Sequence, residues 1–380
     1  IKRGISFCYN MIICVQTIYS FDMLESKRAG RTFVLMKSVG DKGVVFWLFS
    51  GCLLVAIMVI VGGLTRLTHS GLSMVQWSLF METIPPLTTA DWMETFQRYQ
   101  QTPEFKLKNY DFTLSEFKSI FWWEYIHRMI GRFIGLVFLL PFVYFLIKKR
   151  LSKGLVQKLL IACLLGALQA GMGWYMVKSG LVNDPNVSHY RLAAHLTIAF
   201  VLYAYLLWIV LSQVYPQKAS KITTSLVGIQ VLILFTVLQI IYGAFVSGLK
   251  AGLVYNTFPK MGTEWIAESV FYAFETDGIV SFFENLASVQ FIHRYLGVIV
   301  LFLVVYQFIA SRYRKQNKGQ WRSIYFMVAM VSVQVLLGIF TLLYAVPIGL
   351  GAIHQFGALM LFTSQILYYF YSSKHIEQWQ

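Results

Sequence analysis

The sequence predicts an all-α polytopic membrane protein in which eight transmembrane helices form two similar four-helix bundles, arranged as a parallel pseudo-twofold repeat. Three observations lead to this prediction: the composition, the number of long apolar segments and an internal duplication. The 380 residues are 57% hydrophobic and 13% charged, which is far more apolar than one water-soluble core requires.

A helix that crosses a bilayer needs about 20 predominantly apolar residues. Eight stretches of the chain meet this requirement, and they lie at residues 44–64, 121–147, 155–177, 189–213, 222–247, 287–311, 323–345 and 349–371. The lipid bilayer is therefore the expected surroundings of most of the chain.

Lysine and arginine gather in the short loops after the second, fourth and sixth spans. Because these charges resist translocation, we expect those loops and both termini on the inner side of the membrane. The loops 65–120, 178–188 and 249–286 then face outward. The formal net charge of +15 reflects this topology, and nucleic acid is excluded as a partner because the basic residues form no stripe with interleaved aromatics.

The chain contains an internal duplication. "EYIHRMIG" at Glu124–Gly131 recurs 166 residues later as "QFIHRYLG" at Gln290–Gly297, and "GGLTRLTHSGL" weakly matches "GAFVSGLKAGL" at an offset of 181. Each half holds an even number of spans, so both halves insert with the same orientation. The predicted organisation is an N-terminal segment 1–43, a first bundle 44–213 that includes the long outer loop 65–120, an inner linker 214–221, a second bundle 222–372 and an inner tail 373–380.

Four of the seven histidines lie well inside spans, one in each even-numbered span: His127, His195, His293 and His354. Each is expected about five to seven residues from the outer end of its helix, so all four would share one depth. His189, at the edge of the fourth span, is expected at the membrane interface. A single intramembrane histidine can simply hydrogen-bond to a neighbouring helix. Four at matched depth favour haem iron held between facing helices, with two imidazoles as axial ligands in each bundle.

Glycine and arginine accompany two of these histidines. Gly131 and Gly297 each follow a histidine by four residues, on the same helix face, where a missing side chain allows a flat macrocycle to approach. Arg128 and Arg294 directly follow the same histidines and suit the recognition of propionates. Snorkelling of the arginines to the interface is an equal alternative.

The two halves differ at one position that bears on chemistry. Glu124 precedes His127 by three residues, whereas the aligned residue before His293 is Gln290. Glu124 is the only acidic residue that we place within a span, and intramembrane carboxylates are functional candidates. We therefore expect a reaction site in the first half and a redox-only haem in the second, against the alternative that Glu124 only pairs with arginine for packing.

These motifs resemble the haem A synthase family, whose members are membrane oxidoreductases that convert a methyl group of haem O to the formyl group of haem A. The resemblance covers nearly the whole chain from about Met36. It rests on "EYIHRMIGR", "HYRLAAHL", "FIHRYLG" and "IHQFGALML", and on "GGLTRLTHSGLSMVQW" and "GLKAGLVYNTFPKMGTEW". The first outer loop contains no cysteine, which is similar to the mitochondrial and alphaproteobacterial type.

The resemblance implies a role for each site residue. His127 and His195 would bind the substrate haem O, with Glu124 essential to the oxidation, and His293 and His354 would hold a haem b cofactor. It also implies a haem O synthase, a farnesyltransferase, as the partner that supplies the substrate, together with an electron donor that the sequence does not name. The sequence leaves open whether the chain forms a homo-oligomer.

The resemblance and the charge pattern both place the haem sites toward the outer face. We expect a bacterial plasma membrane, with the mitochondrial inner membrane as the alternative. Two other functions use the same features. A dihaem b-type cytochrome that transfers electrons from quinol would need the same four histidines but has less need for Glu124, and a transporter is disfavoured because the spans lack a midplane polar cluster.

Overall fold

The structure is a computed structural model that describes residues 40–75, 83–180, 187–215 and 226–373. The predicted segment 1–43 and tail 373–380 lie almost entirely outside the described residues, as does most of the linker 214–221. The eight predicted spans are confirmed as eight long apolar helices within the described ranges. They are α2 (Lys42–Leu67), α5 (Leu114–Ile147), α6 (Lys153–Gly180), α7 (His189–Val214), α8 (Val227–Gly248), α11 (Leu286–Arg312), α12 (Lys318–Leu343) and α13 (Ile348–Ser373).

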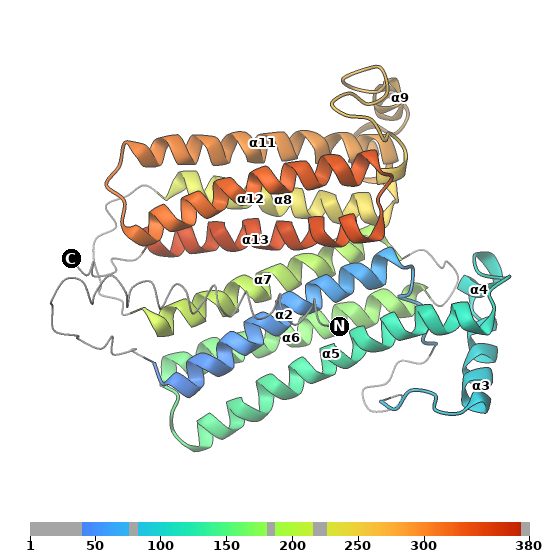
Figure 1. The fold of residues 1–380 in the computed structure, drawn as a ribbon, viewed down its shortest axis with the longest axis horizontal. Helices are drawn as coiled ribbons and strands as arrows, with labels where there is room; N and C mark the ends of the chain where they lie inside the picture. The colour runs from blue at the N-terminus through green and yellow to red at the C-terminus, as the bar shows by residue number, and fades with distance from the viewer. Residues whose placement is uncertain (1–39, 76–82, 181–186, 216–225, 374–380) are drawn as a thin grey trace. The chain divides into compact units, whose positions relative to one another are not determined.

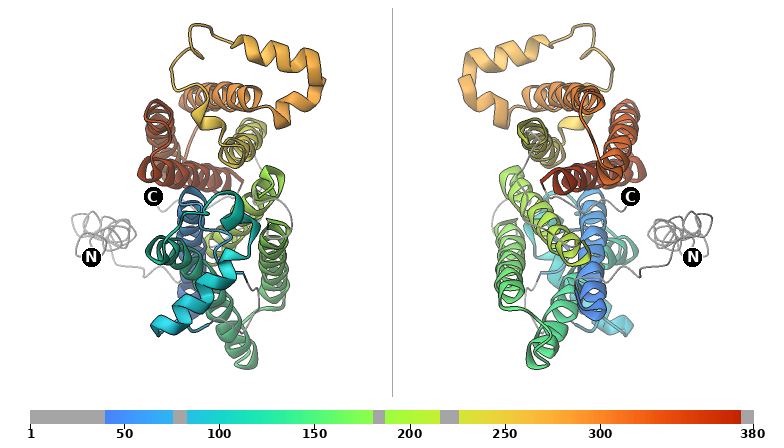
Figure 2. Two further views of the ribbon diagram at one scale, coloured as in Figure 1. Left: turned by 90° about the vertical axis from the view of Figure 1, so that its right-hand side faces the viewer. Right: turned by 90° about the vertical axis from the view of Figure 1, so that its left-hand side faces the viewer.

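These helices form two groups (Figure 1). Helices α2, α5, α6 and α7 contact one another, and so do α8, α11, α12 and α13. The views along the helices show the two groups side by side (Figure 2), and α2 and α7 of the first group contact α13 and α8 of the second. Large apolar side chains such as Phe133, Leu140 and Phe302 are exposed on the outer surfaces of α5 and α11, where lipid would surround them.

Polar contacts reinforce the packing between the groups. Arg66, at the end of α2, donates from Nη2 to the carbonyls of Ser247 at 2.6 Å and Gly248 at 3.2 Å, at the end of α8. Gln355 on α13 donates from Nε2 to the Val59 carbonyl on α2 at 2.8 Å. The parts of the chain that carry the two histidine pairs are thus joined directly through α2.

The described part of the first outer loop contains helices. It contains α3 (Thr89–Gln100) and α4 (Pro103–Leu107), which pack aromatic side chains against the start of α5. Helix α5 begins at Leu114, seven residues before the predicted boundary at 121, because Thr113 and Glu116 form a capping box there. His127 therefore lies 13 residues into its helix, which corrects the expected depth of five to seven residues.

The second outer loop carries the shorter elements η1 (Ala251–Leu253), α9 (Glu268–Asp277), η2 (Gly278–Val280) and α10 (Ser281–Glu284). Figure 1 shows α3, α4 and α9 at the same end of the helices. At the other end, Asp41 caps α2 by accepting from the Gly43 backbone N–H at 2.8 Å and pairs with Arg150, which follows α5. The Arg150 guanidinium lowers the pKa of Asp41.

Candidate active site and paired histidines

Each of the four intramembrane histidines packs its ring against a glycine on a neighbouring helix. A Cβ built on that glycine would lie only 3.0 to 3.2 Å from the histidine Cε1, so the backbone must approach the ring without a side chain between them. The four pairs are His127 with Gly62, His195 with Gly173, His293 with Gly243, and His354 with Gly338. The glycines lie on α2, α6, α8 and α12, and the histidines lie on α5, α7, α11 and α13.

Three of these histidines also contact a glutamine, four residues before the partner glycine. The amide Nε2 of Gln169, Gln239 or Gln334 lies 3.2, 3.5 or 3.4 Å from the imidazole Nε2 of His195, His293 or His354, respectively. At His127 the residue four positions before Gly62 is Met58. The sequence alone assigns no role to these glutamines. Their recurring Gln-x-x-x-Gly spacing is the signal in the sequence that identifies them.

Each of the four histidines has one buried ring nitrogen, Nδ1, without a hydrogen bond among the described residues. Buried polar nitrogens normally have a partner, and an imidazole that binds a metal through one nitrogen uses the other for a hydrogen bond. The pairing of His127 with His195 and of His293 with His354 stays a prediction from the spans.

Glu124 lies on α5, one turn from His127 toward the outer loop. Its side chain is only 3% exposed. Its Oε2 accepts hydrogen bonds from the Ser73 hydroxyl at 2.7 Å and from the Met74 backbone N–H at 2.8 Å, and its Oε1 pairs with Arg128 Nη2 at 2.7 Å. The carboxylate is thus buried beside one histidine pair and fixed in direction by three donors.

Gln290 occupies the corresponding place on α11, with the opposite hydrogen-bonding pattern. Its amide Nε2 donates to the carbonyls of Ala251 at 2.9 Å and Tyr255 at 3.3 Å, and its Oε1 accepts from Arg294 at 3.1 Å. The loop beside Glu124 presents donors, whereas the loop beside Gln290 presents acceptors. A carboxylate at position 290 would therefore face two carbonyl oxygens, so the difference between the halves extends beyond the single residue.

The two arginines hold the outer loops to the helices. Arg128 Nη2 donates to the Met74 carbonyl at 3.1 Å as well as to Glu124. Arg294 donates to the carbonyls of Tyr255, Thr257 and Lys260 at 2.6 to 3.2 Å. A role of these arginines toward haem propionates stays a prediction.

Gly131 and Gly297 lie one turn from their histidines, on the side away from the outer loops. A Cβ built on Gly131 would be 3.4 Å from the Met58 Cε, and one built on Gly297 would be 3.3 Å from the Gln239 Nε2. Each glycine thus faces a side chain of α2 or α8. Their predicted role in admitting a macrocycle is not tested by this contact.

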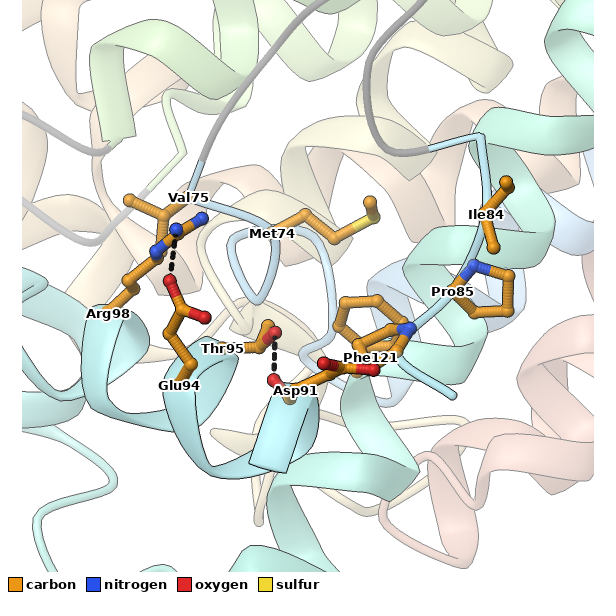
Figure 3. Close-up of a pocket in the computed structure, with 10 residues that line it drawn as sticks. Met74, Val75, Ile84, Pro85, Asp91, Glu94, Thr95, Arg98 and Phe121 are labelled. Atoms are coloured by element: carbon orange, nitrogen blue, oxygen red, sulfur yellow. Dashed lines mark hydrogen bonds and ion pairs between the residues drawn. The ribbon is translucent and has the colours of Figure 1, made fainter. Parts of the chain in front are cut away.

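A surface pocket lies next to the loop that holds Glu124 (Figure 3). It shares Met74 with the Glu124 site, and its wall on α3 carries the exposed ion pair of Arg98 with Glu94 at 2.5 Å. None of the four intramembrane histidines lines it. The residues that line it are Met74, Val75, Ile84, Pro85, Pro86, Asp91, Glu94, Thr95, Arg98 and Phe121. This pocket is therefore separate from the paired histidines.

Within the described residues, the fold and the site define an integral membrane protein with four half-buried histidines on four of its membrane helices and a buried, fixed carboxylate one turn from His127. Residues 45–366 match the family described as "Cytochrome oxidase assembly protein". The chain is 46% identical to the heme A synthase of Flavobacterium psychrophilum, over 84% of this chain and 95% of that protein. It is 45% identical to the heme A synthase of Nitrosospira multiformis, over 86% of this chain and 92% of the relative.

A further heme A synthase, from Wolbachia pipientis, is 42% identical over 88% of this chain and 93% of its own length. Such identity over nearly full length, together with the family match, decides the classification. The chain belongs to the cytochrome oxidase assembly protein family that includes these heme A synthases.

Proposed function

We propose that this chain is a haem A synthase, a membrane oxidoreductase that converts a methyl group of haem O into the formyl group of haem A. The observation that carries this proposal is the buried carboxylate of Glu124 one turn from His127, at a position where the second half has Gln290 one turn from His293. The matched relatives support it, since each is a heme A synthase aligned over most of its length.

The first bundle is the proposed substrate site. His127 and His195 would bind the iron of haem O through imidazole nitrogen, and Gly62 and Gly173 set the positions of their rings. In the second bundle His293 and His354 would hold haem b, which when bound supplies a one-electron carrier. The buried, unpartnered Nδ1 atoms support this use of all four residues.

Glu124 is the proposed acid–base group. Conversion of a methyl group to a formyl group through an alcohol and a hydrated aldehyde removes four electrons, adds one oxygen atom and releases protons at each oxidation. A carboxylate one turn from His127 can accept such a proton or stabilise positive charge that develops at the carbon. Ser73, Met74 and Arg128 fix its direction. At Gln290 only the arginine donor recurs, and carbonyl acceptors face the side chain in place of the Ser73 and Met74 donors.

The experiment is Glu124→Gln, with Gln290→Glu as the matched control in the other half. Each variant is purified from cells that make haem O, and its haems are extracted and identified by mass. We expect Glu124→Gln to keep bound haem O and haem b but to produce no haem A, whereas Gln290→Glu still produces haem A.

Normal haem A production by Glu124→Gln would refute the acid–base role. If the unmodified protein held only haem b and made neither hydroxylated nor formylated haem, the dihaem cytochrome alternative would replace the synthase.

The proposed placement puts both histidine pairs toward the outer side of a bacterial plasma membrane, with the two termini inside. It rests on the basic loops after α5, α7 and α11. A haem O synthase is the proposed supplier of the substrate, because haem O is the prenylated haem that this chain would consume.

A further inference from the structure

Besides Glu124, a second residue distinguishes the surroundings of His127 from those of the other three histidines. Met58 stands four residues before Gly62, whereas a glutamine stands four residues before each of the other three partner glycines. Met58 and Gln239 are separated by 181 residues, the same offset that relates Gly62 to Gly243.

Met58 and Gln239 also occupy matching places in space. The Met58 Cε approaches Gly131, and the Gln239 Nε2 approaches Gly297, at 3.4 and 3.3 Å from a Cβ built on each glycine. Gly131 and Gly297 both follow a histidine by four residues. The first bundle therefore has a thioether at the point where the second has an amide.

The position lies on the membrane side of the histidine. Glu124 is one turn from His127 toward the outer loop, and the contact of Met58 with Gly131 is about one turn, or about 6 Å, in the opposite direction. Charged propionates are costly to bury in hydrocarbon. A haem held at His127 with its propionates toward the outer side of the membrane would turn its apolar edge toward Met58.

The two positions differ in what they tolerate. Met58 is flexible and apolar, so it can pack against a hydrocarbon chain. The Gln239 Oε1 is buried with no hydrogen-bond partner among the described residues, and its Nε2 lies 3.5 Å from the His293 Nε2. A hydrocarbon chain placed against this amide would leave its polar atoms unpaired, which disfavours such a ligand.

On the basis of the proposed function, we propose that Met58 and Gln239 determine which haem each bundle holds. Met58 selects the haem with an isoprenoid substituent in the first bundle, and Gln239 selects haem b, which lacks that substituent, in the second. Both residues are specificity determinants, and neither takes part in the oxidation.

The test measures the identity of the bound haem rather than activity. Four proteins are purified from cells that make haem O and haem b: the wild type, Met58→Leu, Met58→Gln and Gln239→Met. Their haems are extracted, separated by chromatography, and identified and quantified by mass spectrometry. We expect Met58→Leu to keep the wild-type ratio of prenylated haem to haem b. Met58→Gln should lower that ratio about tenfold, the size of one unpaired buried hydrogen-bonding group, and Gln239→Met should raise it.

A wild-type ratio in Met58→Gln that still binds haem b would overturn the selectivity proposal and leave the proposed function intact. If Met58→Gln does not fold, Gln239→Met decides alone, and an unchanged ratio there overturns the proposal. Absence of prenylated haem from the wild-type protein would overturn the proposed function and this inference together.

Discussion

The contact between Gly173 and His195 gives the sharpest test of how the helices position an imidazole. Gly173→Ala adds a Cβ at 3.1 Å from the His195 Cε1 and at 3.7 and 3.8 Å from its two ring nitrogens. Ordinary carbon–carbon contact begins near 3.5 Å, so the ring must move by a few tenths of an ångström. Gly171→Ala, two residues away on the same helix, meets no described atom within 4 Å and is the matched control.

The expected difference in stability follows from two effects. Alanine in place of glycine in a helix stabilises by about 1 kcal/mol, and both variants gain this. Overpacking costs about 1–3 kcal/mol, and only Gly173→Ala bears that cost. Gly171→Ala should therefore be neutral or more stable, and Gly173→Ala should be less stable than the control by about 1–3 kcal/mol.

The assay is haem content together with the optical spectrum of the reduced and oxidised protein, followed by thermal unfolding in detergent. Gly173→Ala should lose haem from the first bundle or show an altered low-spin spectrum, whereas Gly171→Ala should match the wild type. Equal spectra and equal stability of the two variants would refute the close approach of α6 to His195.

Three further predictions concern the second bundle, the outer loop and the topology. His293→Ala and His354→Ala should each lose the retained haem b, as measured by the pyridine haemochrome assay. Unchanged haem content in either variant would refute the prediction that these two histidines hold one haem. Burial and the nearby Glu124 raise the pKa of Glu104 from 4.5 to about 7. Glu104 therefore binds its proton more tightly in the folded loop than in the unfolded one, so the first outer loop should lose about 3 kcal/mol of stability as pH rises from 4.5 through 7. Limited proteolysis at a series of pH values measures this loss. Glu104→Gln should remove the pH dependence. Tyr110→Cys, exposed in the first outer loop, should react with an impermeant thiol reagent from the outer side and Arg314→Cys should not; the reverse pattern would invert the topology.

The spans could be predicted from sequence because they depend on a strong local signal. Twenty apolar residues in the absence of charge have few alternatives to a membrane helix. The start of α5 was missed because Leu114 and Phe117 belong to an extension that packs on the folded loop, which hydropathy does not detect.

The partners of the site residues could not be predicted, because they depend on tertiary contacts. Glu124 was identified as an intramembrane acid, but its donors Ser73 and Met74 lie about 50 positions earlier in a loop with no distinctive composition. The contact of Gln334 with His354 likewise requires the crossing of two helices. Contacts of this kind depend on helix rotation, which a hydrophobic pattern that extends around the whole helix does not specify.

Low-temperature electron paramagnetic resonance of the purified, haem-loaded protein tests the central claim most directly. We predict low-spin ferric signals of bis-imidazole type, one of which disappears in His195→Ala and a different one in His354→Ala. High-spin signals only, or the loss of the same signal in both variants, would contradict two separate histidine-ligated haem sites.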